Sequence, residues 1–168
     1  TSSLAMSNLD GKALHGFDAI ALWSGAAFLS QDIHSIAIVV NAGYQTQIRY
    51  TVAIGNSAGN TCQSTGSVAS GRIAGRTSQG TNSVAIGNEA GQTSQGTCSV
   101  AIGRIAGRQD QSAYSVAIGN EAGKTSQGTQ SVAIGYLAGQ ISQNQNSVAI
   151  GNQAGNKSKD INSVDIGN

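Results

Sequence analysis

The sequence contains no proline, and only 4% of its 168 residues are aromatic and 10% are charged. Nine Lys and Arg against eight Asp and Glu give a net charge of +1, too little for the basic face of a nucleic-acid-binding protein. No apolar run approaches the ~20 residues that a membrane-spanning helix needs, so membrane insertion is not expected. Two cysteines, Cys62 and Cys98, are too few for a disulfide framework and lack metal-ligand spacing. No metal or cofactor is expected.

Glycine, by contrast, is abundant, with 23 residues. With so few aromatic residues, an ordinary globular core would lack bulk, so the apolar residues must be buried by something more repetitive. The motif SVAIG recurs every 16 residues without insertion or deletion. It begins at Ser83, Ser99, Ser115, Ser131 and Ser147.

The same 16-residue frame extends through the whole chain. The full unit reads S-V-A-I-G-N-x-A-G-x-T-S-Q-G-T-x, and we number its positions 1 to 16 from the Ser. Residues 51–168 follow this unit closely, whereas residues 1–50 keep its apolar positions and lose most of its glycines. We therefore expect one continuous repeat domain with a degenerate N-terminal cap.

The unit is too short for a two-helix repeat, which needs about 34 residues, and its glycines disfavour helices. The segment S-V-A-I is β-prone and is followed by a Gly turn that requires positive φ, while x-T-S-Q ending in Gly suggests a second strand and turn. We therefore expect an all-β fold, a parallel β-solenoid of about ten coils, in which identical residues stack in columns. The columns are Val84, Val100, Val116, Val132 and Val148; Ile86, Ile102, Ile118, Ile134 and Ile150; and Gly87, Gly103, Gly119, Gly135 and Gly151.

The S-V-A-I strand has two apolar faces. Val and Ile point to one side, and Ser and Ala point to the other, because side chains alternate along a strand. One face should line the coil interior and the other should meet a second copy of the chain. The alternative is that Ala, being small, faces water. Ser70 interrupts the Ile column, where we expect a mild local weakness.

Two segments carry a complete N-S-V-A-I-G motif, residues 82–87 and 146–151. This motif resembles the heads of trimeric autotransporter adhesins of the YadA-like type, and similar runs occur in fibre and surface proteins of phages and large DNA viruses. The resemblance implies a left-handed β-roll, three rolls packed about a common axis, and adhesion to a host surface at the exterior of a cell or virion.

The leading hypothesis is a non-enzymatic structural or adhesive fibre segment, a homotrimer that binds a receptor, glycan or neighbouring coat protein. Phe17, Trp23 and Phe28 in the degenerate region are candidates for partner docking. One alternative is a minor capsid or envelope protein of a virion. A second is an ice-binding solenoid, because Thr77, Thr93 and Thr125 align, although this column is interrupted.

Two sequence features imitate catalytic sites. The run from Gly119 to Thr125 resembles a phosphate-binding loop but has three residues between its glycines where four are required. His15 and His34, with nearby Asp and Ser residues, lack any local signature of a catalytic triad. The arginines at 72, 76, 104 and 108 are expected to form a solvated edge, with binding of an anionic sugar or a carboxylate as the alternative.

Overall fold

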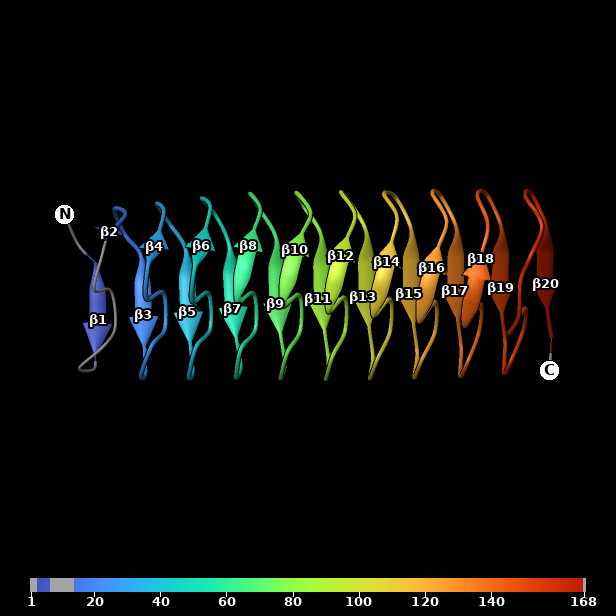
Figure 1. Ribbon diagram of the computed structural model, residues 1–168, viewed down its shortest axis with the longest axis horizontal. Helices are drawn as coiled ribbons and strands as arrows, with labels where there is room; N and C mark the ends of the chain where they lie inside the picture. Colours follow the sequence, from blue (N-terminus) through green and yellow to red (C-terminus); the bar gives the residue numbers. More distant parts are fainter. Residues whose placement is uncertain (1–2, 7–13, 168) are drawn as a thin grey trace.

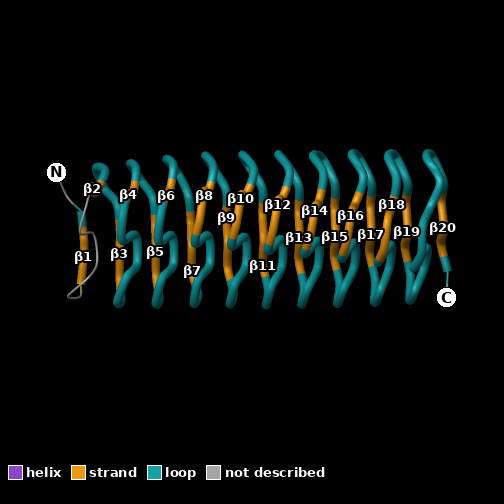
Figure 2. The backbone as a smooth tube through the Cα atoms, viewed as in Figure 1, coloured by secondary structure: helices purple, strands orange, loops and turns teal. Residues whose placement is uncertain are grey.

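A computed structural model of the chain describes residues 3–6 and 14–167. The described chain winds into a parallel β-solenoid with one coil per 16-residue repeat, as predicted, and runs from β1 at one end to β20 at the other (Figure 1). Only strands and turns make up the described residues (Figure 2), and no helix among them is long and apolar enough to cross a membrane.

Two parallel sheets form opposite sides of each coil. The first, sheet A, contains eleven strands that all pair with the next coil in 16-residue register. They are β1 (Leu4–Met6), β3 (Ile20–Leu22), β5 (Ile36–Ile38), β7 (Val52–Ile54), β9 (Val68–Ser70), β11 (Val84–Ile86), β13 (Val100–Ile102), β15 (Val116–Ile118), β17 (Val132–Ile134), β19 (Val148–Ile150) and β20 (Val164–Ile166).

The second sheet, sheet B, contains nine strands in the same register. They are β2 (Leu14–His15), β4 (Ser30–Gln31), β6 (Thr46–Gln47), β8 (Thr61–Gln63), β10 (Thr77–Gln79), β12 (Thr93–Gln95), β14 (Gln109–Gln111), β16 (Thr125–Gln127) and β18 (Ile141–Gln143). Strands from the degenerate region join both sheets, so the described part of residues 1–50 continues the solenoid.

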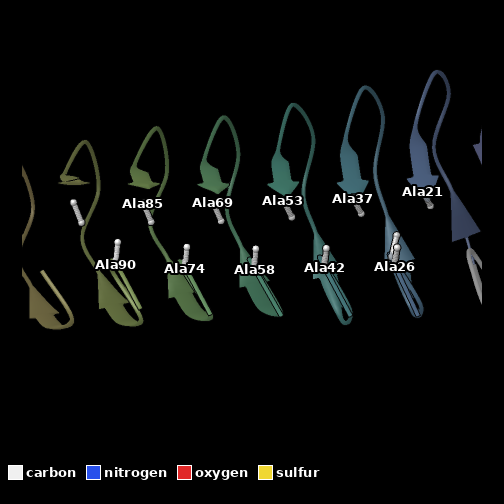
Figure 3. Close-up of a cluster of buried hydrophobic side chains, with 12 residues drawn as sticks. Ala21, Ala26, Ala37, Ala42, Ala53, Ala58, Ala69, Ala74, Ala85 and Ala90 are labelled. Carbon is white, nitrogen blue, oxygen red and sulfur yellow. The ribbon is translucent and has the colours of Figure 1, made fainter. Parts of the chain in front are cut away.

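The coil interior is lined by small side chains. Ala85 and Ala90, at positions 3 and 8, are both 0% exposed, and their equivalents in the other coils form two facing columns (Figure 3). Ser83, at position 1, is also fully buried and donates its hydroxyl hydrogen to the carbonyl of Gly80 at 2.7 Å. The Val and Ile columns therefore face outward, and the alternative in which Ala faces water is wrong.

A buried glutamine at position 13 fills the remaining interior. Gln79 is 1% exposed, and its Nε2 donates to the carbonyl of Val68 at 2.7 Å. This bond joins sheet B to sheet A across the coil. The same contact recurs at Gln63, Gln95, Gln111, Gln127 and Gln143. Each bond satisfies the buried amide N–H of a glutamine, which would cost about 1–3 kcal/mol if it were left without a partner.

Two glycine columns allow the coils to pack this closely. Gly87, at position 5, has φ +126°, and a Cβ there would lie 2.5 Å from the carbonyl oxygen of Gly103 in the next coil. Gly91, at position 9, has φ +51°, and its Cβ would lie 2.6 Å from Oε1 of Gln95. The positive φ predicted for the first turn is confirmed.

The coil that ends with β20 has a different interior. Lys159 takes the glutamine position and Asp165 takes the alanine position, and Lys159 Nζ lies 3.5 Å from Asp165 Oδ2. That oxygen also accepts the backbone N–H of Gly155 at 2.7 Å. In the preceding coil the corresponding N–H, on Gly139, donates to a carbonyl of the next coil. The carboxylate thus replaces a backbone acceptor at this end.

Candidate functional site: the outer faces of the coil

The outer side of sheet A is an almost purely apolar surface, which we call the apolar face. It consists of positions 2 and 4 of every sheet A strand, all occupied by Val, Ile, Leu or Met except Ser70. Ile86 is 41% exposed and Ile102 is 36% exposed, although the inward side of the same strand is fully buried. The face is therefore a continuous apolar surface exposed along the whole described rod.

The extent of this face is large for a chain of this size. Eleven strands spaced ~4.8 Å apart give a length of ~50 Å, and a three-residue strand is ~10 Å wide. The resulting ~500 Å² per chain is at the upper end of what an isolated soluble protein exposes as one apolar patch. Such a surface marks an interaction site more often than it faces water.

The outer side of sheet B is polar. Thr77 pairs in register with Thr61 on one side and Thr93 on the other. The next coil carries Gln109 in this column, and Thr125 follows it. The predicted threonine column is therefore a real row on sheet B, interrupted once before it ends at Ile141. The two outer faces of the solenoid thus differ completely in chemistry.

Ion pairs line the turn that joins the two sheets. Glu89 lies between two arginines, 3.4 Å from Arg72 and 3.3 Å from Arg108. Glu121 is 3.7 Å from Arg104 and 3.0 Å from Lys124. The hydrogen bond from Lys124 is the main cause that holds the pKa of Glu121 below its ordinary value.

These pairs neutralise most of the basic spot expected from the sequence. Arg72, Arg104 and Arg108 are each paired with a carboxylate, while Arg76 is exposed. Partly exposed pairs of this kind contribute little stability, typically about 0–1 kcal/mol each. The arrangement supports the solvated-edge interpretation better than an anion-binding surface.

The three aromatic residues proposed for partner docking lie at different places around the coil. Phe17, at position 15, and Trp23, at position 5, are 60% and 64% exposed and flank opposite turns. Phe28, at position 10, is half-buried and stacks on Tyr44 with ring centroids 4.9 Å apart. They therefore do not form one docking patch.

Trp23 lies next to the apolar face. It occupies the glycine column at the end of β3, with φ +84°, an unusual conformation for a bulky residue. Beside it, Met6, Leu22 and Ser24 complete an apolar pocket of about 470 Å³. Met6 and Leu22 belong to the position-4 column, so the pocket is continuous with the apolar face.

The candidate catalytic groups form no recognisable site. His34 Nδ1 is 3.9 Å from Asp18 Oδ2, but both side chains are about half exposed, and the imidazole stacks on Tyr50. The side chain of His15 and residue Asp10 lie outside what the structure describes. No group of three or more His, Cys, Asp or Glu side chains in the described ranges could hold a metal ion.

The remaining sequence features lie on the surface. Lys124 of the phosphate-loop imitation points to Glu121 rather than into a phosphate cradle. Cys62 and Cys98 are both free and exposed. No family model, curated protein or solved structure matches this chain.

Proposed function

We propose that this chain is a structural or adhesive segment of a surface fibre, in which copies associate through the apolar face and expose sheet B and the turns. The observation that carries the proposal is the contrast between the two sheets. Sheet A presents Val and Ile to the outside in every coil from β5 onward, with the single exception of Ser70, whereas sheet B presents mainly Thr and Ser.

The area of the apolar face suits self-association. Two faces of ~500 Å² bury ~1,000 Å² in total, which reaches the size expected of a specific interface. At ~25 cal/mol per Å² this corresponds to a gross gain of ~25 kcal/mol, from which the ~4–15 kcal/mol or more of lost translational and rotational freedom and the cost of ordering interface side chains are subtracted. A copy of the same face is a fitting partner because it carries no charge that would be buried unpaired.

The number three comes from the resemblance to adhesin heads. Faces only ~10 Å wide allow three copies to surround one axis, with their Val and Ile columns meeting at the centre. The polar faces then point away from the axis, available to a receptor, glycan or coat protein. On this proposal the protein acts at the surface of a cell or virion, in a non-enzymatic role.

Molar mass in solution, measured by light scattering, tests the proposal. The trimer predicts about three times the 16.9 kDa chain mass. A variant with Ile102→Ser and Ile118→Ser should dissociate toward the monomer, because two hydroxyls per chain would enter the interface. The matched control, Thr93→Ser with Thr125→Ser on sheet B, should remain assembled. A wild-type monomer at high concentration would overturn the proposal.

A minor capsid or envelope protein would use the same apolar face, but its partner would be a coat protein and not a second copy of the chain. It would be supported if the chain stayed monomeric alone but bound a coat protein through the apolar face. The same Ile102→Ser and Ile118→Ser variant should then lose that binding.

Ice binding is a second candidate because the threonine residues stand in register from coil to coil on one sheet. The interruption at Gln109 weakens this candidate, since an ice-binding plane should be continuous. A thermal-hysteresis measurement decides it. Activity that disappears in the control variant with Thr93→Ser and Thr125→Ser would favour ice binding over the fibre.

A further inference from the structure

The regularity of the repeat leaves the alignment of associated copies along the rod undetermined. Two features of the apolar face can determine it. Because every coil presents nearly the same Val and Ile, neighbouring copies can slide by whole coils with little change in contacts. A fibre built this way would have no fixed register. We propose that Ser70 and the pocket beside Trp23 fix that register, with each copy's Trp23 filling the pocket of its neighbour. This inference rests on the proposed self-association.

Ser70 is the single polar residue in the apolar face over the described strands. Its strand pairs directly with Ile54 on one side and Ile86 on the other. When copies lie parallel and level, with the same coils side by side, each Ser70 contacts the Ser70 of another copy, and their hydroxyls can hydrogen-bond. After a slip of one coil, each hydroxyl is buried against Ile without a partner, which is unfavourable. A lone polar residue fixes register in coiled coils for the same reason.

The pocket at Trp23 adds a second, independent marker. It lies at the end of the apolar face and is lined by Met6, Leu22, Trp23 and Ser24. The Trp23 side chain is 64% exposed, and Met6 is 65% exposed, so both are free to contact a neighbour. In this column the next coil carries Val39 and the regular coils carry Gly, so a copy displaced along the rod would place a smaller side chain, or none, opposite the pocket.

The backbone conformation at Trp23 is uncommon for a bulky residue. Trp23 and Val39 both hold positive φ, +84° and +88°, in the column where the regular coils have Gly. Bulky side chains tolerate this conformation poorly, and it persists only when the surrounding structure maintains it. Glycine would be the easier choice for folding alone. The exposed indole beside the pocket is available to contact a neighbouring copy.

Cysteine cross-linking measures the register directly. Cys62 and Cys98 are first replaced by Ser, and Ile86→Cys and Ile118→Cys are introduced into two separate chains of different mass. The two chains are refolded together and oxidised. Because the sites are two coils apart, ~10 Å, level copies should form only like-with-like disulfides. Mixed disulfides report copies that have slipped by two coils.

The same mixture is then prepared with Ser70→Ile, with Trp23→Ala and with both changes. The double variant should give mixed disulfides in a yield comparable to the like-with-like product, while light scattering still shows the assembly. The control is Phe17→Ala, which removes an equally exposed aromatic ring from the opposite turn and should leave only like-with-like products. Circular dichroism confirms that each variant folds.

Three outcomes would overturn the inference. Mixed disulfides in the otherwise native chain would show that no register exists. Exclusively like-with-like products in the double variant would show that other residues set it. A monomer in light scattering would remove the proposed function and the inference together, and is distinguished from the other two by its mass.

Discussion

Replacing Ala101 with valine should destabilise the solenoid, whereas enlarging its outward neighbour Val100 should not. Ala101 is 0% exposed, and a Cβ built on Gly107 would already lie 3.1 Å from the Ala101 Cβ. Two additional methyl groups therefore have no space to enter. Its partners in the adjacent coils, Ala85 and Ala117, stand in register and are also fully buried, so the strand cannot shift away from the opposite wall.

Overpacking of a closed core costs typically about 1–3 kcal/mol. For a chain of this length, each kcal/mol lowers the melting temperature by about 2–4 °C, so Ala101→Val should melt about 2–12 °C below the native protein. The matched change Val100→Ile adds a methylene on the outward side, where Ile20 and Ile36 already occupy the column. Its effect should stay within about 0.5 kcal/mol.

Thermal unfolding followed by far-ultraviolet circular dichroism at one fixed protein concentration measures both variants. If Ala101→Val melted like the native protein and Val100→Ile lost several degrees, the inward and outward faces would be assigned the wrong way round. The apolar face, and the function proposed from it, would then have to be abandoned.

Gly103→Ala should lower the melting temperature more than any surface change, because φ is +126° and the added Cβ would lie 2.5 Å from the next coil's carbonyl oxygen; native-like melting would refute the close packing of coils. Gln111→Ala should lower the free energy of unfolding in urea by about 1–3 kcal/mol, since it removes the buried hydrogen bond from Gln111 Nε2 to the carbonyl of Val100 at 2.8 Å and leaves a cavity in the coil interior. The hydrogen bond from Lys124 lowers the pKa of Glu121 in the folded protein. The ionised Glu121 therefore stabilises the fold at pH values above its ordinary pKa of about 4.3. This contribution is lost as the pH falls through the lowered pKa of the folded state. Urea titrations from pH 7 to pH 3 should therefore show a smaller acid-induced loss for Glu121→Gln, and an identical loss would contradict the assignment.

The 16-residue repeat was sufficient to predict the architecture. Fixed spacing, β-prone segments and paired glycine turns together favour stacked coils, and the parallel register of both sheets confirms this. Even the turn glycine at position 5 follows from local sequence, because few other residues adopt its φ. Local periodicity determines this fold almost completely.

Which face of the S-V-A-I strand points into the coil could not be predicted from the repeat in the same way. Hydrophobicity favours burying Val and Ile over Ala, yet the coil is too thin for them because glycine and glutamine approach from the other side. Gln95, for example, extends across the interior to the carbonyl of Val84 at 2.7 Å. Which of two apolar faces is buried thus depends on the distance between the sheets, a property of the whole coil.

The buried glutamine column was the feature of the coil interior that the sequence did not lead us to predict. A signal for it exists, because Gln31 and Gln47 retain the residue in coils that have lost the regular Thr-Ser-Gln motif. Polar residues are normally assigned to the surface, which hid the signal. The aromatic residues Phe17, Trp23 and Phe28 are close in sequence, but the winding of the coil places them at positions 15, 5 and 10 of the repeat, so partner docking stays a prediction for each of them separately.

The most direct measurement for the central claim is the rate at which a single cysteine in the apolar face reacts with a maleimide. The probe is Ile102→Cys in a chain whose two native cysteines are replaced by Ser, and the reference is Cys62 alone, which is exposed on sheet B. If other copies cover the apolar face, Ile102→Cys should react much more slowly than Cys62 in the concentrated, assembled protein. After dilution to monomers the two cysteines should react at about the same rate. Equal rates at every concentration would mean that nothing covers the apolar face, and the account would be wrong.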